Sequence, residues 1–347
     1  MPEGTIAGWD IGGAHLKVAV AAGGRLKFVT QIPCPLWQGI EPLDAAVAEA
    51  RARVGEAGLS AVTMTGEMTD LFANREDGVR RLVDASERLL PGEVLIYAGT
   101  QGFLAPDRAV LCPDRVASAN WLASATFAAQ ACSLARSQGL FVDVGSTTTD
   151  LVAFRDGRVL AQAFTDRERL VAGELVYTGV SRTPVFAIAD RVPHRGRDHP
   201  LIPELFATMA DVYRLCGALP ADADQLPAAD HQGKTQDDSA RRLARMIGCD
   251  VESASIEAWR DIARHLAEAQ RRRLAAAAER LFATSGLDRR APLLGAGVGR
   301  FLVRALAQEF GRDYVDFGDL VDAQDGAREG AARCAPAAAL ALLAAGR

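Results

Sequence analysis

Two stretches of the sequence, GWDIGGAHLKVAV at Gly8–Val20 and LFVDVGSTTTDLVAF at Leu140–Phe154, follow the same plan. In each, a short apolar segment ends in an aspartate (Asp10 or Asp143), a glycine follows two residues later, and a second apolar segment returns. Apolar segments joined by a short glycine-containing link predict a β-hairpin. Glycine lets backbone N–H groups turn toward an anion, and a carboxylate at a strand end can hold a hydrated Mg²⁺ against phosphate oxygens. The repeated plan therefore predicts two loops that hold one polyphosphate between them.

Length and composition favour a water-soluble protein of two domains. At roughly 150 residues per domain, the 347 residues suggest a division into 1–137 and 138–347. No apolar run is long enough to span a membrane, and the first residues lack the pattern of a signal peptide. A net charge of −5 argues against nucleic acid as the main partner. Six scattered cysteines without a CxxC pair predict reduced thiols in the cytoplasm.

Lysine is rare in this chain, which makes its positions informative. Of the 39 basic residues, only Lys17, Lys27 and Lys234 are lysine. A compact ammonium and a guanidinium are not equivalent beside a phosphate, so the lysines of an arginine-rich sequence are candidates for a chemical role. Lys17 follows the first glycine turn and is the candidate cation for a phosphate. A solvated surface charge is the alternative for all three, and is the expectation for Lys27.

Strand and turn signals predict two similar β-meanders, one in each half of the chain. Their strands are residues 5–10, 16–21, 26–32, 140–144, 149–154 and 159–164. Between the meanders, periodicity and capping residues predict further helices and buried strands. These are helices 43–54, 74–90 and 120–136, the last with Ser118 as candidate N-cap, and strands 61–65 and 94–97.

The stretch 170–290 is predicted to be a helical insertion into the second half, with polar loops at 191–203 and 219–236. Its clearest element is a helix over about 256–282 with one apolar stripe. A strand and a glycine-rich turn follow in PLLGAGVGR, where Gly295 and Gly297 become candidate phosphate-binding residues because such a turn lets a phosphate approach the backbone. The Ala- and Leu-rich end predicts a last helix over about 328–343 that ties the two halves together.

The order of these three glycine-rich turns resembles that of the actin-like ATPase superfamily. Asp10–Lys17 resembles its first phosphate loop, Val142–Thr149 its second and Leu294–Gly299 its adenosine loop. Within it, the sequence is similar to the hydantoinase A/oxoprolinase-like branch, and to small members linked to tetrahydromethanopterin-dependent one-carbon metabolism. Further stretches that carry the resemblance are 8–14, 64–72, 118–121, 173–180 and 325–333. The resemblance implies an α/β, two-lobed, ribonuclease H-like fold with the insertion in the second lobe.

The narrow group includes a methanofuran-biosynthesis synthase, and the resemblance implies its chemistry. An aminomethyl-furfuryl diphosphate would be joined to the phenol oxygen of a tyrosine or tyramine derivative, with release of pyrophosphate. Charge stabilisation of the leaving diphosphate would supply much of the catalysis. Mg²⁺ is the expected cofactor, ATP stays open as a second ligand, and a homodimer is compatible with the sequence.

The candidate site combines the loops with this resemblance. Asp10 and Asp143 are the metal candidates. Lys17, Glu67 and Glu174 are the catalytic candidates, with the two glutamates as possible bases for the phenol. The phosphate-binding candidates are Gly12, Gly13, Gly145, Ser146, Thr147, Thr148, Gly295 and Gly297. For Glu67 and Glu174, and for Asp70 as a further base, the alternative is a structural carboxylate at a helix start.

Two other functions stay open at this point. One is an ATP-dependent kinase or oxoprolinase/hydantoinase-like hydrolase, and the other is a nucleotide-dependent clamp without chemistry. The kinase is disfavoured because the sequence has no convincing Gly-x-Asp base motif, and because Ala14-His15 replaces the hydroxyl residues of many relatives. The reaction products distinguish the alternatives, because the synthase would release pyrophosphate and an ATP-dependent enzyme would release ADP and phosphate.

Overall fold

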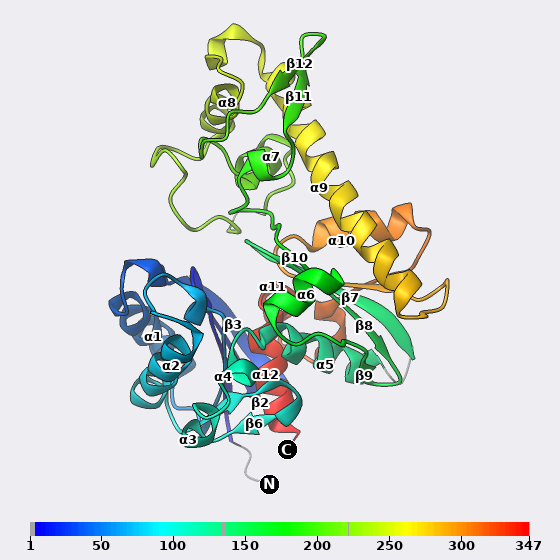
Figure 1. Cartoon of the computed structure of the whole chain (residues 1–347). Helices are drawn as coiled ribbons and strands as arrows, with labels where there is room; N and C mark the ends of the chain where they lie inside the picture. Colours follow the sequence, from blue (N-terminus) through cyan, green and yellow to red (C-terminus); the bar gives the residue numbers. More distant parts are fainter. Residues whose placement is uncertain (1–3, 133–136, 221, 347) are drawn as a thin grey trace.

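The structure, a computed structural model, describes residues 4–132, 137–220 and 222–346. It has two lobes, each built on one mixed β-sheet, and an arm that projects away from them at the top of Figure 1. The first sheet has the order β3-β2-β1-β4-β5-β6, and the second has the order β10-β8-β7-β13-β14 with β9 beside β8. This is the α/β, two-lobed architecture that the sequence predicted.

In the first lobe, an antiparallel meander is extended by parallel strands on the other edge of β1. Its strands are β1 (Ile6–Ile11), β2 (His15–Ala22), β3 (Arg25–Pro33), β4 (Leu59–Met64), β5 (Glu93–Tyr97) and β6 (Phe103–Leu104). Helices α1 (Glu41–Val54) and α2 (Arg75–Leu89) cover one face, and α3 (Pro106–Ala109) and α4 (Pro113–Val116) are short. The predicted strands and these two long helices are present, with ends shifted by at most two residues.

The second lobe repeats the meander incompletely. Its strands are β7 (Gln138–Val144), β8 (Thr149–Arg155), β9 (Arg158–Val159), β10 (Leu175–Val176), β13 (Leu293–Ala296) and β14 (Tyr314–Asp316). The strand predicted over 159–164 is therefore limited to β9. Leu160 still donates its N–H to the carbonyl of Ala153 at 2.8 Å, whereas Phe164 packs on a helix, with its ring 6.3 Å from that of Trp121. Helices α6 (Asp166–Ala172) and α10 (Arg300–Glu309) complete this lobe.

Two helices cross between the lobes. Helix α5 (Asn120–Cys132) follows the first sheet in sequence but packs on β7 and β8, whereas α12 (Ala335–Ala345) packs on β1 and β2. The two helices contact each other, and their small side chains share one apolar core with residues of both sheets. Gly8 is required in β1 because a Cβ there would collide with the backbone of α12. The end predicted for α5 at residue 136 lies outside the described residues.

The end of the chain forms two helices where one was predicted over 328–343. Helix α11 (Ala327–Arg333) stops before Cys334, and α12 starts again with Pro336 in its first turn. Pro336 has no N–H to continue the hydrogen bonds of α11. The carbonyl of Ala332, four residues earlier, accepts the N–H of Gly297 instead, at 2.7 Å.

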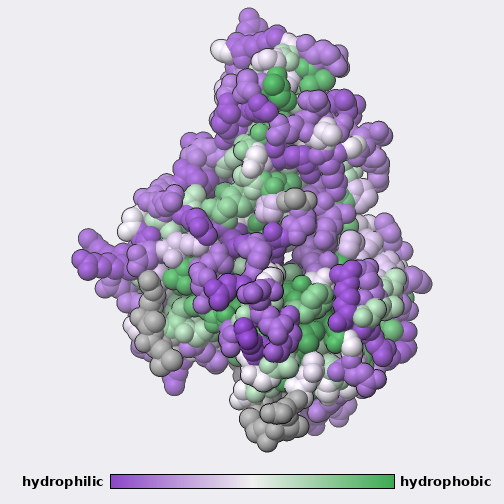
Figure 2. Space-filling model, turned by 180° about the vertical axis from the view of Figure 1, so that it is seen from behind, coloured by the Kyte–Doolittle hydropathy of each residue, from purple (hydrophilic) through white to green (hydrophobic). Residues whose placement is uncertain are grey.

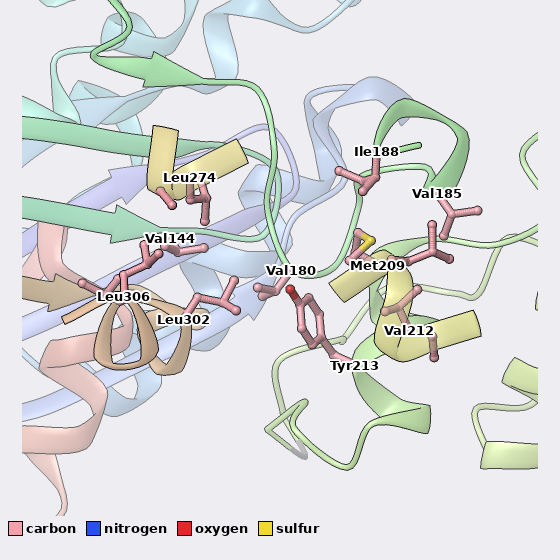
Figure 3. Close-up of a cluster of buried hydrophobic side chains, with 14 of the residues drawn as sticks. Val144, Val180, Val185, Ile188, Met209, Val212, Tyr213, Leu274, Leu302 and Leu306 are labelled. Atoms are coloured by element: carbon pink, nitrogen blue, oxygen red, sulfur yellow. The ribbon is translucent and has the colours of Figure 1, made fainter. Parts of the chain in front are cut away.

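The arm consists of β11 (Arg191–His194), β12 (Arg197–Pro200), α7 (Met209–Leu215), α8 (Gln236–Arg245) and the first half of α9 (Ile256–Thr284). A β-hairpin thus stands where a polar loop was predicted over 191–203. Arg195 and Gly196 form its two-residue turn with positive φ angles of 49° and 71°, as a type I′ turn demands. Figure 3 shows the apolar core that continues from the second lobe into the arm, from Leu306 past Val180 to Val212.

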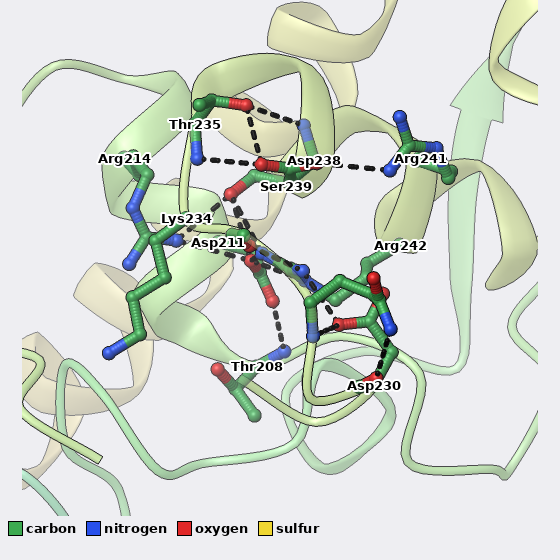
Figure 4. A network of polar contacts seen from close by, with 12 residues as sticks. Thr208, Asp211, Arg214, Asp230, Lys234, Thr235, Asp238, Ser239, Arg241 and Arg242 are labelled. Carbon is green, nitrogen blue, oxygen red and sulfur yellow. Dashed lines mark hydrogen bonds and ion pairs between the residues drawn. The ribbon is translucent and has the colours of Figure 1, made fainter. Parts of the chain in front are cut away.

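A buried polar network holds the loop before α8 (Figure 4). Arg242, which is fully buried, donates to Asp211 at 2.7 Å and to Asp230 at 2.9 Å. Lys234 belongs to the same loop, and its ammonium donates to the backbone carbonyls of Asp224 and Leu226 at 2.7 and 2.5 Å. The ammonium of Lys234 therefore holds its own loop together through backbone carbonyls.

Most of the face seen in Figure 2 is hydrophilic, with apolar side chains showing along the arm and low on the body. Within the described residues, no helix combines the length and the apolar character needed to cross a membrane.

Candidate active site

The two loops predicted from the sequence line a single cleft of about 610 Å³ between the lobes. The first loop contributes Gly12, Gly13, Ala14 and Lys17, and the second contributes Gly145, Ser146, Thr147 and Thr148. The prediction that Gly12 and Gly145 face the same cleft is thus confirmed.

The two loops have the same backbone turn. Gly12 N–H donates to the carbonyl of His15 at 3.0 Å, and Gly145 N–H donates to the carbonyl of Thr148 at 2.9 Å. A Cβ on Gly12 would lie 2.9 Å from the His15 oxygen, and one on Gly145 would lie 3.2 Å from the Thr148 oxygen. Neither glycine has a positive φ, so close approach of the backbone is what requires glycine here.

The turns leave backbone donors unused at the cleft. In the part of the chain that the structure describes, the N–H groups of Gly13 and Ala14 in the first loop, and of Ser146 and Thr147 in the second, donate to no protein acceptor. Unused amides on two facing loops are a suitable environment for phosphate oxygens.

The residues opposite the two aspartates carry different charges. Asp10 is paired with Lys17 in the β1–β2 register, and Lys17 Nζ lies 3.1 Å from Asp10 Oδ2. Asp143 is paired with Asp150 in the β7–β8 register, and Asp150 accepts a hydrogen bond from Arg169 at 2.7 Å. The same position of the hairpin thus holds a cation in one lobe and an anion in the other.

These surroundings shift the pKa values of both loops. Burial raises the pKa of Asp143 to about 7, and the charge of Asp150 adds to this effect. Burial by itself would lower the pKa of Lys17, but the carboxylates of Asp10 and Asp143 outweigh it, so the pKa is raised and the ammonium keeps its proton. Burial lowers the pKa of His15 to about 4, helped by Lys17 and Arg182.

Several buried polar atoms around the loops have no partner among the described residues: Asp10 Oδ1, His15 Nε2 and Ser146 Oγ. Buried polar atoms without partners are costly, which points to a polar ligand. Asp10 does not itself line the cleft, whereas Lys17 and Asp143 do. No cluster of three or more metal-ligating side chains exists among the described residues. Mg²⁺ commonly uses one or two carboxylates together with water and phosphate oxygens, and Asp10 with Asp143 fits that pattern.

Gly295 and Gly297 do not line the cleft, and their contact with phosphate stays a prediction. Gly295 lies in β13 where a Cβ would meet the ring of Tyr314 at 2.6 Å. Gly297 has a φ of 82°, and its N–H donates to Ala332. Both glycines are explained by close packing, and Val298 is the member of this turn that reaches the cleft.

Glu67 and Glu174 lie behind the wall of the cleft. Glu67 is 1% exposed and accepts a hydrogen bond from the Ser118 hydroxyl at 2.9 Å; Ser118 was predicted as a helix cap but serves this carboxyl group instead. Glu174 is buried beside Arg169, with 3.9 Å between Oε2 and Nε, and burial raises its pKa. Asp70 does line the cleft. Neither glutamate lines the cleft, and a catalytic role for them stays a prediction.

Other cleft residues were missed by the sequence analysis. Asp166 and Arg169 line the cleft from α6, and Arg182 stacks on Trp37 across it, 5.1 Å from the ring centre. Arg169 also stacks on Trp121 at 3.8 Å. A capping box at Thr165 places α6, and that Ser/Thr-x-x-Glu pattern is the signal that would have drawn attention to this segment.

Comparison with known proteins gives a consistent result. The hydantoinase/oxoprolinase family model matches residues 59–319. The chain is similar to a (4-{4-[2-(gamma-L-glutamylamino)ethyl]phenoxymethyl}furan-2-yl)methanamine synthase of Methanocaldococcus jannaschii. The two sequences are 30% identical over 261 residues, which cover 75% of this chain and 77% of that protein. A synthase of the same name from Methanococcus vannielii is 27% identical over 118 residues, which cover 34% of this chain and 53% of that protein.

Among solved structures, a nucleotide-free acetone carboxylase has a TM-score of 0.57 at 10% identity, covering 89% of this chain and 68% of that one. At this identity the likeness concerns the fold alone. It agrees with the two-lobed actin-like ATPase fold predicted from the sequence.

Proposed function

Because the chain belongs to the hydantoinase/oxoprolinase family, we propose that it is a transferase that joins a furfuryl-type diphosphate to a phenol oxygen and releases pyrophosphate. The name of the Methanocaldococcus relative describes a phenoxymethyl link to a furan. Such an ether forms when a phenol oxygen displaces a leaving group from the CH₂ of the furan. The reaction would belong to the biosynthesis of a methanofuran-type cofactor, with small molecules as substrates.

The observation that carries the proposal is the pair of loops with unused amides and Lys17 on one cleft. A diphosphate needs donors along its length as negative charge builds on the oxygen that leaves. Donors fixed before the reaction stabilise that charge without reorganisation. Lys17 is fixed by its ion pair with Asp10, at 3.1 Å, so its ammonium is positioned before a substrate arrives.

Asp10 and Asp143 are the residues that would hold a hydrated Mg²⁺. When bound, the ion would neutralise charge on the diphosphate. Two features support the fit. Asp10 Oδ1 is buried without a partner among the described residues. Burial raises the pKa of Asp143 to about 7, with the charge of Asp150 acting in the same direction and that of Lys17 acting against it.

The remaining wall of the cleft suits the organic part of the substrates. Trp37, Trp121 and Tyr177 line it, and the guanidinium of Arg169 stacks on the Trp121 ring at 3.8 Å. Aromatic walls stack on planar rings such as furan and phenol. Loss of the diphosphate from a furfuryl carbon leaves a resonance-stabilised cation, so these walls would also keep water from competing with the phenol.

The test is the identity of the products. Purified protein with Mg²⁺ is incubated with a furfuryl-type diphosphate and tyrosine or tyramine derivatives, with and without ATP. The expected result is an ether and one pyrophosphate per ether, independent of ATP. Turnover that requires ATP hydrolysis, or ATPase activity with no turnover of any furfuryl diphosphate, would contradict the transferase and favour an ATP-dependent hydrolase or kinase.

A further inference from the structure

Ser118 connects the cleft to a carboxyl group that the cleft does not reach. Its side chain lines the cleft, and its Oγ donates to Glu67 Oε1 at 2.9 Å and lies 3.3 Å from Asp166 Oδ2. Ser118 also has a φ of 51°. A left-handed conformation is unfavourable for a non-glycine residue, so the fold holds this hydroxyl in place against a local preference.

Glu67 has the surroundings of a proton acceptor. It is 1% exposed, and its Oε2 has no partner among the described residues. Burial raises its pKa to about 6, Asp166 acts in the same direction, and the Ser118 hydrogen bond and Arg75 act against it. Such a group is charged at neutral pH and still basic enough to take a proton in a reaction.

Asp166 differs from Glu67 in having a cationic partner. Arg75 Nη2 lies 2.5 Å from Asp166 Oδ2, so the charge of this carboxylate is already compensated. The shorter contact of the Ser118 hydroxyl is with Glu67. The single hydroxyl proton is therefore assigned to Glu67, with Asp166 and Arg75 positioning the serine.

We propose that the phenol gives up its proton to Glu67 through the Ser118 hydroxyl. The phenol proton moves to Ser118 Oγ as the serine proton moves to Glu67 Oε1. The electron pair of the phenol oxygen forms the new C–O bond to the furfuryl carbon, and the C–O bond to the diphosphate breaks with its electrons on the departing pyrophosphate. Ser118 is then the catalytic residue, and Glu67 acts through it. This inference rests on the proposed transferase function.

The first test is the pH dependence of ether formation. Mg²⁺ is kept saturating at every pH, so that protonation of Asp143, whose pKa is about 7, does not shape the profile. Glu67 is protonated below about pH 6 and can no longer accept a proton, so kcat/KM falls as the pH falls through that value. Glu67→Gln should reduce kcat/KM by about 10²- to 10⁴-fold, the usual contribution of a general base, and should remove this acid limb. Ser118→Ala should do the same. Glu76→Gln, at an exposed glutamate of α2, is the matched control and should leave the rate and the profile unchanged.

The second test uses a phenol that loses its proton more easily, so that it depends less on a base. A ring-fluorinated tyramine derivative, more acidic than tyramine, should restore Glu67→Gln and Ser118→Ala much more than it accelerates the unmodified protein. A merely structural role would not give this rescue, and melting curves identify a variant that fails to fold.

Three results would overturn the inference: a normal rate and acid limb in both variants, equal losses with both phenols, or an acid limb that disappears in Asp166→Asn but persists in Glu67→Gln. Absence of ether formation by the unmodified protein would overturn the proposed function itself, and the relay with it.

Discussion

The two hairpin loops share a backbone but differ in charge. Both place an aspartate at the strand end, and both close with a glycine N–H bonded three residues ahead, at 3.0 and 2.9 Å. The residue across the hairpin is Lys17 in the first lobe and Asp150 in the second. Asp10 is therefore neutralised within its own hairpin, whereas Asp143 has a pKa raised to about 7. The two loops thus have the same unused amides but different charges. The first loop contains a cation, and the second is the proposed site for one.

The largest effect should come from removing the charge that only the first loop carries. Lys17→Ala should lower kcat/KM for the furfuryl diphosphate by about 3 to 4 kcal/mol of transition-state stabilisation, the typical cost of losing a preorganised donor. Lys17→Arg should recover only part of it, because the guanidinium is bulkier and its charge more diffuse. Steady-state pyrophosphate release measures both, with Lys27→Ala as the control. Equal activity of the Ala and Arg variants would show that the loops do not differ in this way.

The second loop is tested by Asp143→Asn, which should raise the Mg²⁺ concentration for half-maximal activity by about 10- to 100-fold, as loss of an outer-shell metal partner typically does. Because the pKa of Asp143 is about 7, its carboxylate is protonated below that pH. The unmodified protein should therefore need less Mg²⁺ at pH 8 than at pH 6, and the variant should lose this difference.

Asp84→Asn, at an exposed aspartate of α2, is the control. It should change neither the Mg²⁺ concentration for half-maximal activity nor the dependence of that concentration on pH. An unaltered Mg²⁺ requirement in Asp143→Asn would contradict the assignment of the metal to this loop.

The shared backbone itself is tested by adding one methyl group to each turn. Gly12→Ala places a Cβ 2.9 Å from the His15 oxygen, and Gly145→Ala places one 3.2 Å from the Thr148 oxygen. The first should lower the free energy of unfolding by about 1–3 kcal/mol, as overpacking does, and the second by about 1 kcal/mol or less. Urea titrations measure both, and Gly58→Ala, where the nearest atom is 3.9 Å away, should be neutral. A larger loss for Gly145→Ala than for Gly12→Ala would contradict the closer approach of the backbone in the first turn.

The smallest effect is expected for His15→Gln. Because the pKa of His15 is about 4, the imidazole is neutral from pH 5 to 8, and its replacement should not change the shape of the pH profile in that range. The KM for the diphosphate should rise by the factor that corresponds to the loss of one hydrogen bond, which is about 0.5–1.5 kcal/mol of binding free energy. Loss of an ionisation between pH 5 and 8 in this variant would show that His15 is charged in the working enzyme.

The fold was more predictable than the site. Hairpins, helix starts and glycine turns depend on residues close in sequence, which is why β1 to β5 and α9 were placed within two residues of their ends. The incorrect predictions concern residues whose contacts lie far away in sequence. The strand predicted over 159–164 was shortened where Phe164 packs on Trp121. The last helix was divided at Pro336, which has no N–H to donate, and the carbonyl of Ala332 accepts the N–H of Gly297, which follows β13.

The candidate site was also predictable only where a residue's position depends on its neighbours in sequence. Gly12, Lys17, Asp143 and Gly145 were recognisable because each stands at a fixed distance from a turn. Gly297 has the same local signature, yet its N–H is used by Ala332, and nothing near it in sequence indicates this. Glu67 was a candidate base by its position after a strand, but its burial behind Ser118 depends on residues 51 positions apart.

By itself, the sequence determined the two hairpins, the order of the glycine turns, the two-lobed α/β fold and the identity of the cation and carboxylates at the strand ends. Those features are local, since a turn and its flanking strands are specified by a dozen neighbouring residues. Only the tertiary structure decided which side chains reach the cleft, which amides are already bonded, and which carboxyl groups are shifted in pKa. Those properties depend on burial and on partners brought together from distant segments, as Asp166 and Arg75 are, and no local pattern encodes them.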